Sequence, residues 1–134
     1  MHSISLTAAW SSFPVTEESR GWARWFGEPT NVASPEQVWL VAEGVEQRRL
    51  WLNGDRLTEE VTTRSPVLVT GRLQRRNLLL LLPAEVDAGA ARNWTSALME
   101  GRCEVTRQSL PRELTRVALL IGKELVDFRT SPDR

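Results

Sequence analysis

The chain has 134 residues, of which 41% are hydrophobic and 25% charged, and its 17 basic and 17 acidic side chains give a formal net charge of zero. This length and composition predict one globular domain, residues 1–134, with a core large enough to fold without disulfide bonds. The single cysteine excludes an intrachain disulfide. The neutral balance argues against a nucleic-acid partner, because nucleic-acid-binding proteins usually present a net basic face.

Neither a leader nor a membrane segment is predicted. The N-terminal stretch MHSISLTAAWSSF lacks the charged and apolar regions of a signal peptide. The apolar runs, such as the five leucines of residues 78–82, are far shorter than the ~20 residues that span a bilayer. We therefore expect a cytoplasmic protein with no membrane partner, or a secreted one whose signal peptide has been removed.

Short apolar segments separated by turn formers predict an all-β domain. In chain order the candidate strands are residues 3–8, 22–26, 37–43, 48–53, 66–70, 77–82, 101–107 and 115–121, with 124–128 as a further candidate for the last strand. Turn formers crowd the loop of residues 27–36. Pro83 ends the leucine run, because proline has no N–H to donate to a strand ladder.

Several segments are apolar at every position, which predicts strands covered on both faces. Val38 and Leu40 alternate with Trp39 and Val41. Because successive side chains of a strand point to opposite faces, both faces of this strand need an apolar cover. The leucines of residues 78–82 are interpreted in the same way.

The stretch LWLNGDRL, residues 50–57, predicts a tight β-hairpin. Its Asn-Gly dipeptide suits a type I′ turn, in which both central residues need a positive φ. Leu50 and Leu52 would share one face with Leu57 as a cross-strand neighbour, and Trp51 would face the other side.

Two segments are compatible with more than one element. Residues 87–99 contain helix formers and could make one or two helical turns. In residues 114–128 the apolar side chains fall at helical spacing, but the same stretch can also form two strands around a Gly-Lys turn. We favour the hairpin here, because the rest of the chain is predicted to be β.

Residues 38–54 read VWLVAEGVEQRRLWLNG, residues 65–82 read SPVLVTGRLQRRNLLLLL, and RWFGEPT lies upstream at 24–30. This order of pieces resembles the non-catalytic sugar-binding domain of family-2 glycoside hydrolases, the relatives of β-galactosidase, β-glucuronidase and β-mannosidase. The residues that match the family pattern are Trp39, Leu40, Glu43, Gly44, Val45, Trp51, Leu52, Asn53, Gly54, Val69, Thr70, Leu73, Asn77 and Leu78. The resemblance implies a galactose-binding-like jelly-roll β-sandwich of about eight strands.

The departures from the family pattern limit what the resemblance implies. Val67 and Leu68 stand where relatives carry an aromatic residue and an aspartate. The hydrolases hold their catalytic glutamates in a barrel that these residues do not include, so no catalytic residue is implied. In the resembled domains the matching threonine begins a short turn, and we expect the Thr70 hydroxyl to cap Leu73 or a neighbouring backbone N–H.

The sequence contains few of the residues and motifs that catalysis or metal binding requires. His2, the only histidine, lies at the terminus, which excludes a Ser–His triad and a histidine-rich metal site. Cys103 lies in a predicted strand, and we expect a buried, inert thiol there. No glycine-rich phosphate loop and no calcium-loop spacing are present. We therefore expect no metal, no cofactor and no enzymatic activity.

Six tryptophans and no tyrosine are the least ordinary feature of the composition. Trp39 and Trp51 lie in the middle of predicted strands and suit the core. The other tryptophans lie nearer loops, where an indole face could stack on a sugar ring or pack over one end of the sandwich. The candidate ligand-binding residues are Trp22, Trp25, Trp94, Arg24, Glu28 and Asn31, with Arg92 as a further hydrogen-bond partner.

These expectations favour a non-catalytic carbohydrate-binding module. The alternative is a structural or assembly module that associates with itself or with another protein and has no sugar ligand. A concave groove with a tryptophan would favour the first alternative, and a flat apolar patch would favour the second.

Overall fold

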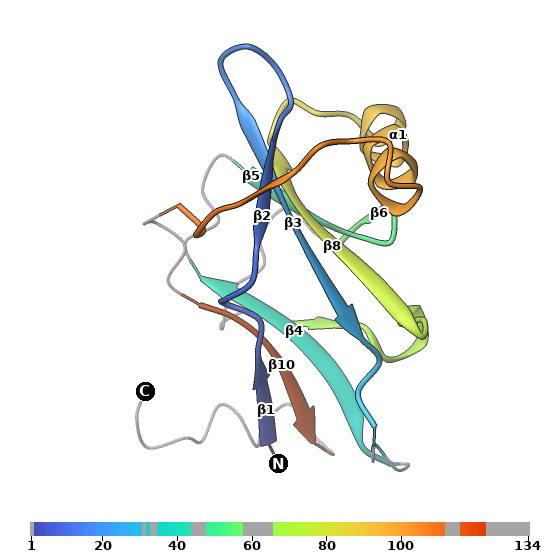
Figure 1. Ribbon diagram of the computed structural model, residues 1–134. Coiled ribbons are helices and arrows are strands. Elements are labelled where there is room, and N and C mark those ends of the chain that lie inside the picture. Colours follow the sequence, from blue (N-terminus) through green and yellow to red (C-terminus); the bar gives the residue numbers. More distant parts are fainter. Residues whose placement is uncertain are drawn as a thin grey trace.

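Two antiparallel sheets packed face to face form the protein (Figure 1). The computed structural model describes residues 2–30, 32, 35–43, 48–57, 66–111 and 116–122. The predicted all-β sandwich is confirmed, with ten strands in these described ranges where about eight were expected.

The smaller sheet has four strands. In spatial order these are β1 (His2–Ser5), β10 (Arg116–Gly122), β4 (Gln37–Glu43) and β7 (Val67–Leu68). The predicted segments 37–43 and 115–121 therefore pair with each other in the middle of this sheet. The second half of the predicted C-terminal hairpin, residues 124–128, lies outside the described residues.

The larger sheet has six strands. In spatial order these are β6 (Asp55–Arg56), β5 (Arg48–Leu52), β8 (Arg76–Pro83), β3 (Arg20–Gly27), β2 (Ser11–Pro14) and β9 (Thr106–Arg107). Strand β2 was not predicted, because its four residues include two serines and a proline and carry no apolar alternation. The strand predicted at 101–107 is confined to β9.

The leucine run of β8 is buried on both faces, as the sequence predicts. Leu79 and Leu81 point between the sheets, whereas Leu78, Leu80 and Leu82 point to the opposite face. All five are fully buried, and each contributes about 1.5–3 kcal/mol by leaving water.

Helix α1 (Ala88–Met99) covers the second face of β8. Its twelve residues make three turns, more than the one or two expected. Asp87 caps the first turn by accepting a hydrogen bond from the N–H of Ala90 at 2.8 Å. Ala91 and Leu98 pack onto the leucines, so tertiary packing stabilises a helix whose local signal is weak.

The Asn53-Gly54 hairpin is confirmed. Both residues have positive φ, 52° and 93°, and the turn joins β5 to β6. Leu57 donates its N–H to the carbonyl of Leu50 at 3.1 Å. Trp51 belongs to the opposite, helix-covered face, as expected.

Thr70 begins a 3₁₀ turn, η1 (Thr70–Arg72), but the predicted cap is wrong. Its hydroxyl accepts a hydrogen bond from the N–H of Val38 on β4 at 2.9 Å. Thr70 therefore ties the turn to the smaller sheet, because sheet pairing places the end of β7 beside the start of β4.

Candidate functional site

A pocket of about 630 Å³ opens at the end of the larger sheet where β3 and β5 begin and β8 ends. It lies beside the β2–β3 loop at the top of Figure 1. The lining residues are Glu18, Ser19, Arg20, Trp22, Arg48, Pro83, Ala84 and Glu85. Four of these side chains are charged, two of each sign.

The β2–β3 loop forms the first wall of the pocket. The Thr16 hydroxyl accepts hydrogen bonds from the backbone N–H groups of Glu18 and Ser19 at 3.2 and 3.0 Å. The carbonyl of Ser19 in turn accepts from the N–H groups of Val15 and Thr16. This local network is the ordinary way in which a threonine organises a turn, and it fixes the backbone that presents Glu18.

Arg20 has a fixed position at the pocket. Its Nε donates to the Ser12 hydroxyl at 2.7 Å, and Ser12 is fully buried and bonds the carbonyl of Gly21 at 3.2 Å. The exposed guanidinium of Arg20 is thereby anchored through a buried hydroxyl.

Trp22 contributes only part of its indole to the pocket. The residue is 7% exposed and belongs to the core between the sheets. The guanidinium of Arg48 lies over the ring, 5.5 Å from its centroid, in a cation–π arrangement. The indole N–H of Trp22 is buried and has no hydrogen-bond acceptor.

The turn after β8 forms the remaining wall. The N–H of Val86 bonds the carbonyl of Pro83 at 3.1 Å, which closes a turn that includes Ala84 and Glu85. Arg49 donates to the carbonyl of Ala84. Sheet pairing places Arg48 opposite Pro83, so strand register decides which side chains meet at the pocket.

The chemistry of the pocket is that of hydrogen bonding. Guanidinium groups donate, and the carboxylates of Glu18 and Glu85 accept. Both glutamates are exposed, whereas a glycosidase acid needs a carboxyl group kept protonated by an apolar site. Among the described residues no group of three His, Cys, Asp or Glu side chains could hold a metal ion.

The structure separates the predicted site residues. Trp22 lines the pocket, but Trp25 and Trp94 pack against the helix-covered face of the larger sheet. The guanidinium of Arg76 lies 5.9 Å from the Trp25 ring centroid, and Trp94 tilts against Phe13 with centroids 5.0 Å apart. Each of the three rings therefore has a neighbour against it.

The predicted polar residues are also spread out. Arg24 donates to the carbonyls of Ala8 and Trp25 at 2.7 and 2.6 Å. Burial lowers the pKa of Arg24, although an arginine with partial burial stays charged at neutral pH. Glu28 is exposed just after β3, and Arg92 is exposed on α1. Asn31 lies outside the described residues.

Cys103 differs from its predicted setting. It lies in the turn region after α1 rather than in a strand, and it is partly buried beside the helix-covered cluster. Burial, and then the charge of Glu104, raise the pKa of its thiol. A raised pKa keeps the thiol protonated and poorly nucleophilic, as expected for an inert cysteine.

Sequence reasoning missed four charged residues of the pocket, namely Glu18, Arg20, Arg48 and Glu85. They come from three separate segments and carry no shared motif. The alternation of β3 did contain a signal for one of them, because Arg20 and Trp22 are two residues apart and so share a face of the strand.

No protein-family model matches the chain, and no curated protein matches it either. The resemblance to the family-2 sugar-binding domain therefore stays a prediction. Among the described residues, α1 and the other helical turn are too short to cross a membrane.

Proposed function

We propose that the protein is a non-catalytic carbohydrate-binding module whose ligand occupies the pocket beside Trp22. The pocket itself carries this proposal, because its volume lies within the roughly 300–1,000 Å³ typical of small-molecule sites. Equal numbers of guanidinium and carboxylate groups offer donors and acceptors without net charge, which suits a neutral ligand rich in hydroxyl groups.

The sugar is recognised mainly by hydrogen bonds with the charged side chains at the rim of the pocket. Because Arg48 lies over the Trp22 ring, a sugar meets Arg20, Arg48 and the two glutamates before it meets an indole face. Such an open, polar site gives weak binding, with a Kd of roughly millimolar to micromolar.

The assembly alternative has less support. The exposed large apolar side chains of the described residues are Ile4, Leu68, Met99 and Val105. They lie on β1, on β7, at the end of α1 and before β9, so they do not form one flat apolar patch of the kind that marks an interface.

A glycan array tests the proposal, followed by titration of tryptophan fluorescence with any sugar that binds. We expect Arg20→Ala and Glu85→Gln each to weaken binding by about threefold to tenfold, the loss of one or two rim hydrogen bonds. Arg20→Lys should restore part of the affinity by keeping the charge.

Matched controls are Arg107→Ala on the exposed strand β9 and Trp25→Ala on the other side of the larger sheet. Both should bind as the unmodified protein does. An array without any bound glycan, together with a stable dimer in light scattering, would favour the assembly module instead.

A further inference from the structure

A cluster of arginines lies at the end of the larger sheet opposite the pocket. Its members are Arg72 on η1, Arg75 and Arg76 at the start of β8, and Arg92 on α1. None of these four guanidinium groups has a carboxylate within ion-pair distance in the described part of the chain. Three are exposed and Arg72 is half-buried.

The Asn53-Gly54 turn brings the arginine cluster together from distant parts of the sequence. The Asn53 amide donates to the carbonyl of Arg72 at 3.3 Å and to the side chain of Asn77, the residue after Arg76, at 3.0 Å. On the other side of the turn, a Cβ placed on Gly54 would lie 3.8 Å from Cγ of Arg92. Hydrogen bonds of the Asn53 side chain therefore hold together the backbone segments that carry Arg72 and Arg76.

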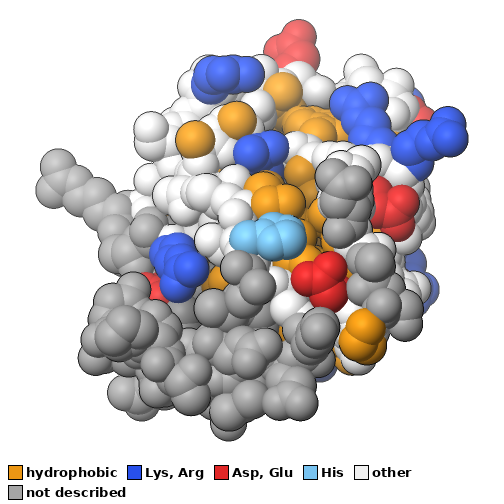
Figure 2. All heavy atoms as spheres, turned by 90° about the horizontal axis from the view of Figure 1, so that it is seen from below, with side chains coloured by type: hydrophobic (Ala, Val, Ile, Leu, Met, Phe, Trp, Pro, Cys, Tyr) orange, Lys and Arg blue, Asp and Glu red, His pale blue; other side chains and the backbone are white. Residues whose placement is uncertain are grey.

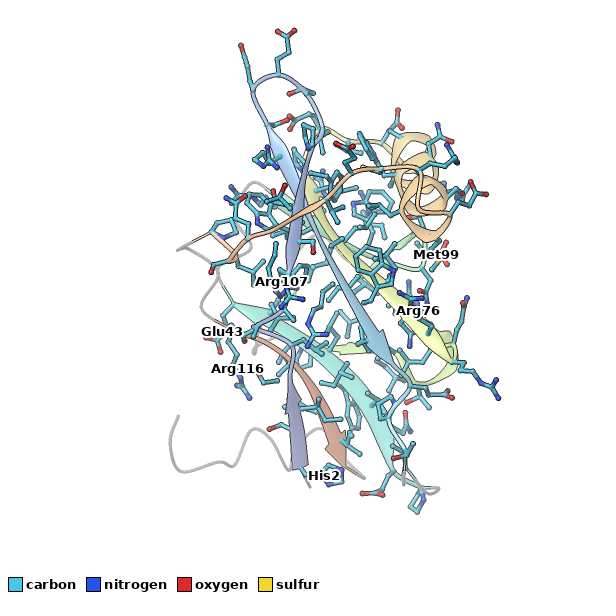
Figure 3. The ribbon with its side chains drawn as sticks, in the orientation of Figure 1. His2, Glu43, Arg76, Met99, Arg107 and Arg116 are labelled. Carbon is cyan, nitrogen blue, oxygen red and sulfur yellow. The ribbon has the colours of Figure 1, made fainter. Side chains whose placement is uncertain are left out.

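Two members of the arginine cluster are held by further contacts. Arg76 lies over the Trp25 ring, and Arg72 donates to the carbonyl of Arg56 at 3.3 Å. Figure 3 places Arg76 at the lower end of β8. In the view from below, Figure 2 shows Lys and Arg side chains side by side at the upper right, and others at the top left, near the centre and on the left. Two exposed carboxylates lie on neighbouring backbone: the N–H of Glu28 bonds the carbonyl of Arg75 at 3.2 Å, and Asp55 directly follows the Asn53-Gly54 turn.

We propose that the arginine cluster binds an anionic saccharide chain through its sulfate or carboxylate groups. The four guanidinium groups come from η1, the start of β8 and α1 and three of them are exposed, so an extended ligand with repeated charges suits the surface better than a single small anion. Arg76 of the cluster and Pro83 of the pocket lie at opposite ends of strand β8, about 23 Å apart for a strand of this length. This proposal is therefore independent of the ligand that the pocket binds.

A nucleic acid fits the arginine cluster less well. Proteins that bind single strands usually offer aromatic rings on which the bases stack, and the Trp25 ring is already covered by Arg76. Proteins that bind duplexes usually carry a net basic domain, whereas this chain has a net charge of zero. A sulfated saccharide needs neither feature.

Retention on heparin, a sulfated saccharide, tests this proposal with the full chain. We expect binding at low salt that sodium chloride releases, and no retention on uncharged dextran. Arg75→Ala/Arg92→Ala should weaken heparin binding about threefold or more, the loss of two exposed charge contacts. Neither side chain makes a hydrogen bond or ion pair in the described structure, so the double variant should keep the unmodified melting temperature.

Two matched variants separate the outcomes. Arg75→Lys/Arg92→Lys, which keeps both charges, and Arg102→Ala/Arg107→Ala, which removes two exposed arginines elsewhere, should both bind heparin nearly as the unmodified protein does. Equal weakening by the two alanine pairs would overturn the proposal, as would absence of retention. Tighter binding to single-stranded DNA than to heparin would also overturn it and would assign the surface to nucleic acid. Arg20→Ala should leave heparin binding unchanged.

Discussion

Asn77 satisfies all of its side-chain hydrogen-bonding groups without any contact with solvent. Its Oδ1 accepts from the N–H of Gln74 at 2.8 Å and from the amide of Asn53 at 3.0 Å. Its Nδ2 donates to the carbonyls of Gln74 and Phe26 at 2.8 and 3.4 Å. One polar residue thus joins the turn before β8, the hairpin and β3.

Asn77→Ala should lower the free energy of unfolding by about 2 kcal/mol, because the N–H of Gln74 loses its acceptor and the Asn53 amide loses one of its two acceptors. Urea denaturation measures the change. Asn93→Ala, on the exposed side of α1, is the control and should change stability by less than about 0.5 kcal/mol. Equal midpoints for the two variants would contradict the role of this network.

Gly21 and Gly27 lie near the two ends of β3 and differ in the space around them. A Cβ on Gly21 would lie 2.7 Å from Cζ of Phe13 and 2.9 Å from Cδ2 of Leu82, whereas a Cβ on Gly27 would meet only the carbonyl of Arg75 at 3.9 Å. We expect Gly21→Ala to cost about 1–3 kcal/mol through overpacking. Gly27→Ala should be nearly neutral, and thermal melts of the pair compare them directly.

At the scale of elements, the Asn53-Gly54 turn is the feature that local chemistry specifies most strongly. Gly54 has a φ of +93°, and a Cβ there would make only ordinary contacts, the nearest at 3.8 Å from Cγ of Arg92, so conformation rather than space selects glycine there. The side chain of Asn53 also ties the turn to β8, because its oxygen accepts a hydrogen bond from the N–H of Leu78 at 2.9 Å.

Gly54→Ala should lower stability by about 1–2 kcal/mol, because an L-residue is strained in the left-handed region. Gly71→Ala is the matched control: a Cβ there meets nothing within 4 Å and φ is not positive, so reduced entropy of the unfolded chain should leave stability unchanged or slightly higher. Denaturant midpoints decide the comparison. Similar losses in both variants would argue against conformational strain at the turn.

Helix α1, unlike the Asn53-Gly54 turn, is stabilised mainly by tertiary packing and only weakly by its local sequence. Although its alanines favour a helix, the segment is only twelve residues long, contains Gly89 and has a single side-chain cap, Asp87, which together predict little helix in isolation. The leucines on the outer face of β8 supply the apolar surface on which Ala91 and Leu98 pack. The three-turn helix is therefore stabilised by the apolar face of β8 that it buries.

For the whole molecule, four tryptophans are buried in three clusters, of which the one between the sheets contains residues of both sheets. Trp10 and Trp22 contact the cluster between the sheets, Trp51 lies on the helix-covered face, and Trp39 lies on the far face of the smaller sheet. All four are at least nine-tenths buried. Because residues of both sheets form the cluster between them, the chain should unfold cooperatively.

We therefore expect tryptophan fluorescence and far-ultraviolet circular dichroism to give coincident unfolding curves in guanidinium chloride, with a red shift of the emission on unfolding. Acrylamide should quench mainly Trp25 and Trp94, which are only partly buried. Two separate transitions would show that the sheets unfold independently and would contradict a single domain.

The sequence by itself determined the features that depend on neighbours along the chain. Short apolar segments between turn formers located most strands, the Asn-Gly dipeptide located the hairpin, and the leucine run indicated a strand buried on both faces. These signals are local because strand periodicity and turn conformation are properties of a few consecutive residues.

Only the tertiary structure decided which residues meet at the pocket. Of its lining, sequence reasoning selected Trp22 alone, since Glu18, Arg48 and Glu85 come together through the pairing of β3 and β5 with β8. The hydrogen bonds of the Asn53 amide likewise join the segments that carry Arg72 and Arg76, which are distant from Asn53 in the sequence. Such contacts join residues far apart in the sequence, and no local pattern encodes the register that creates them.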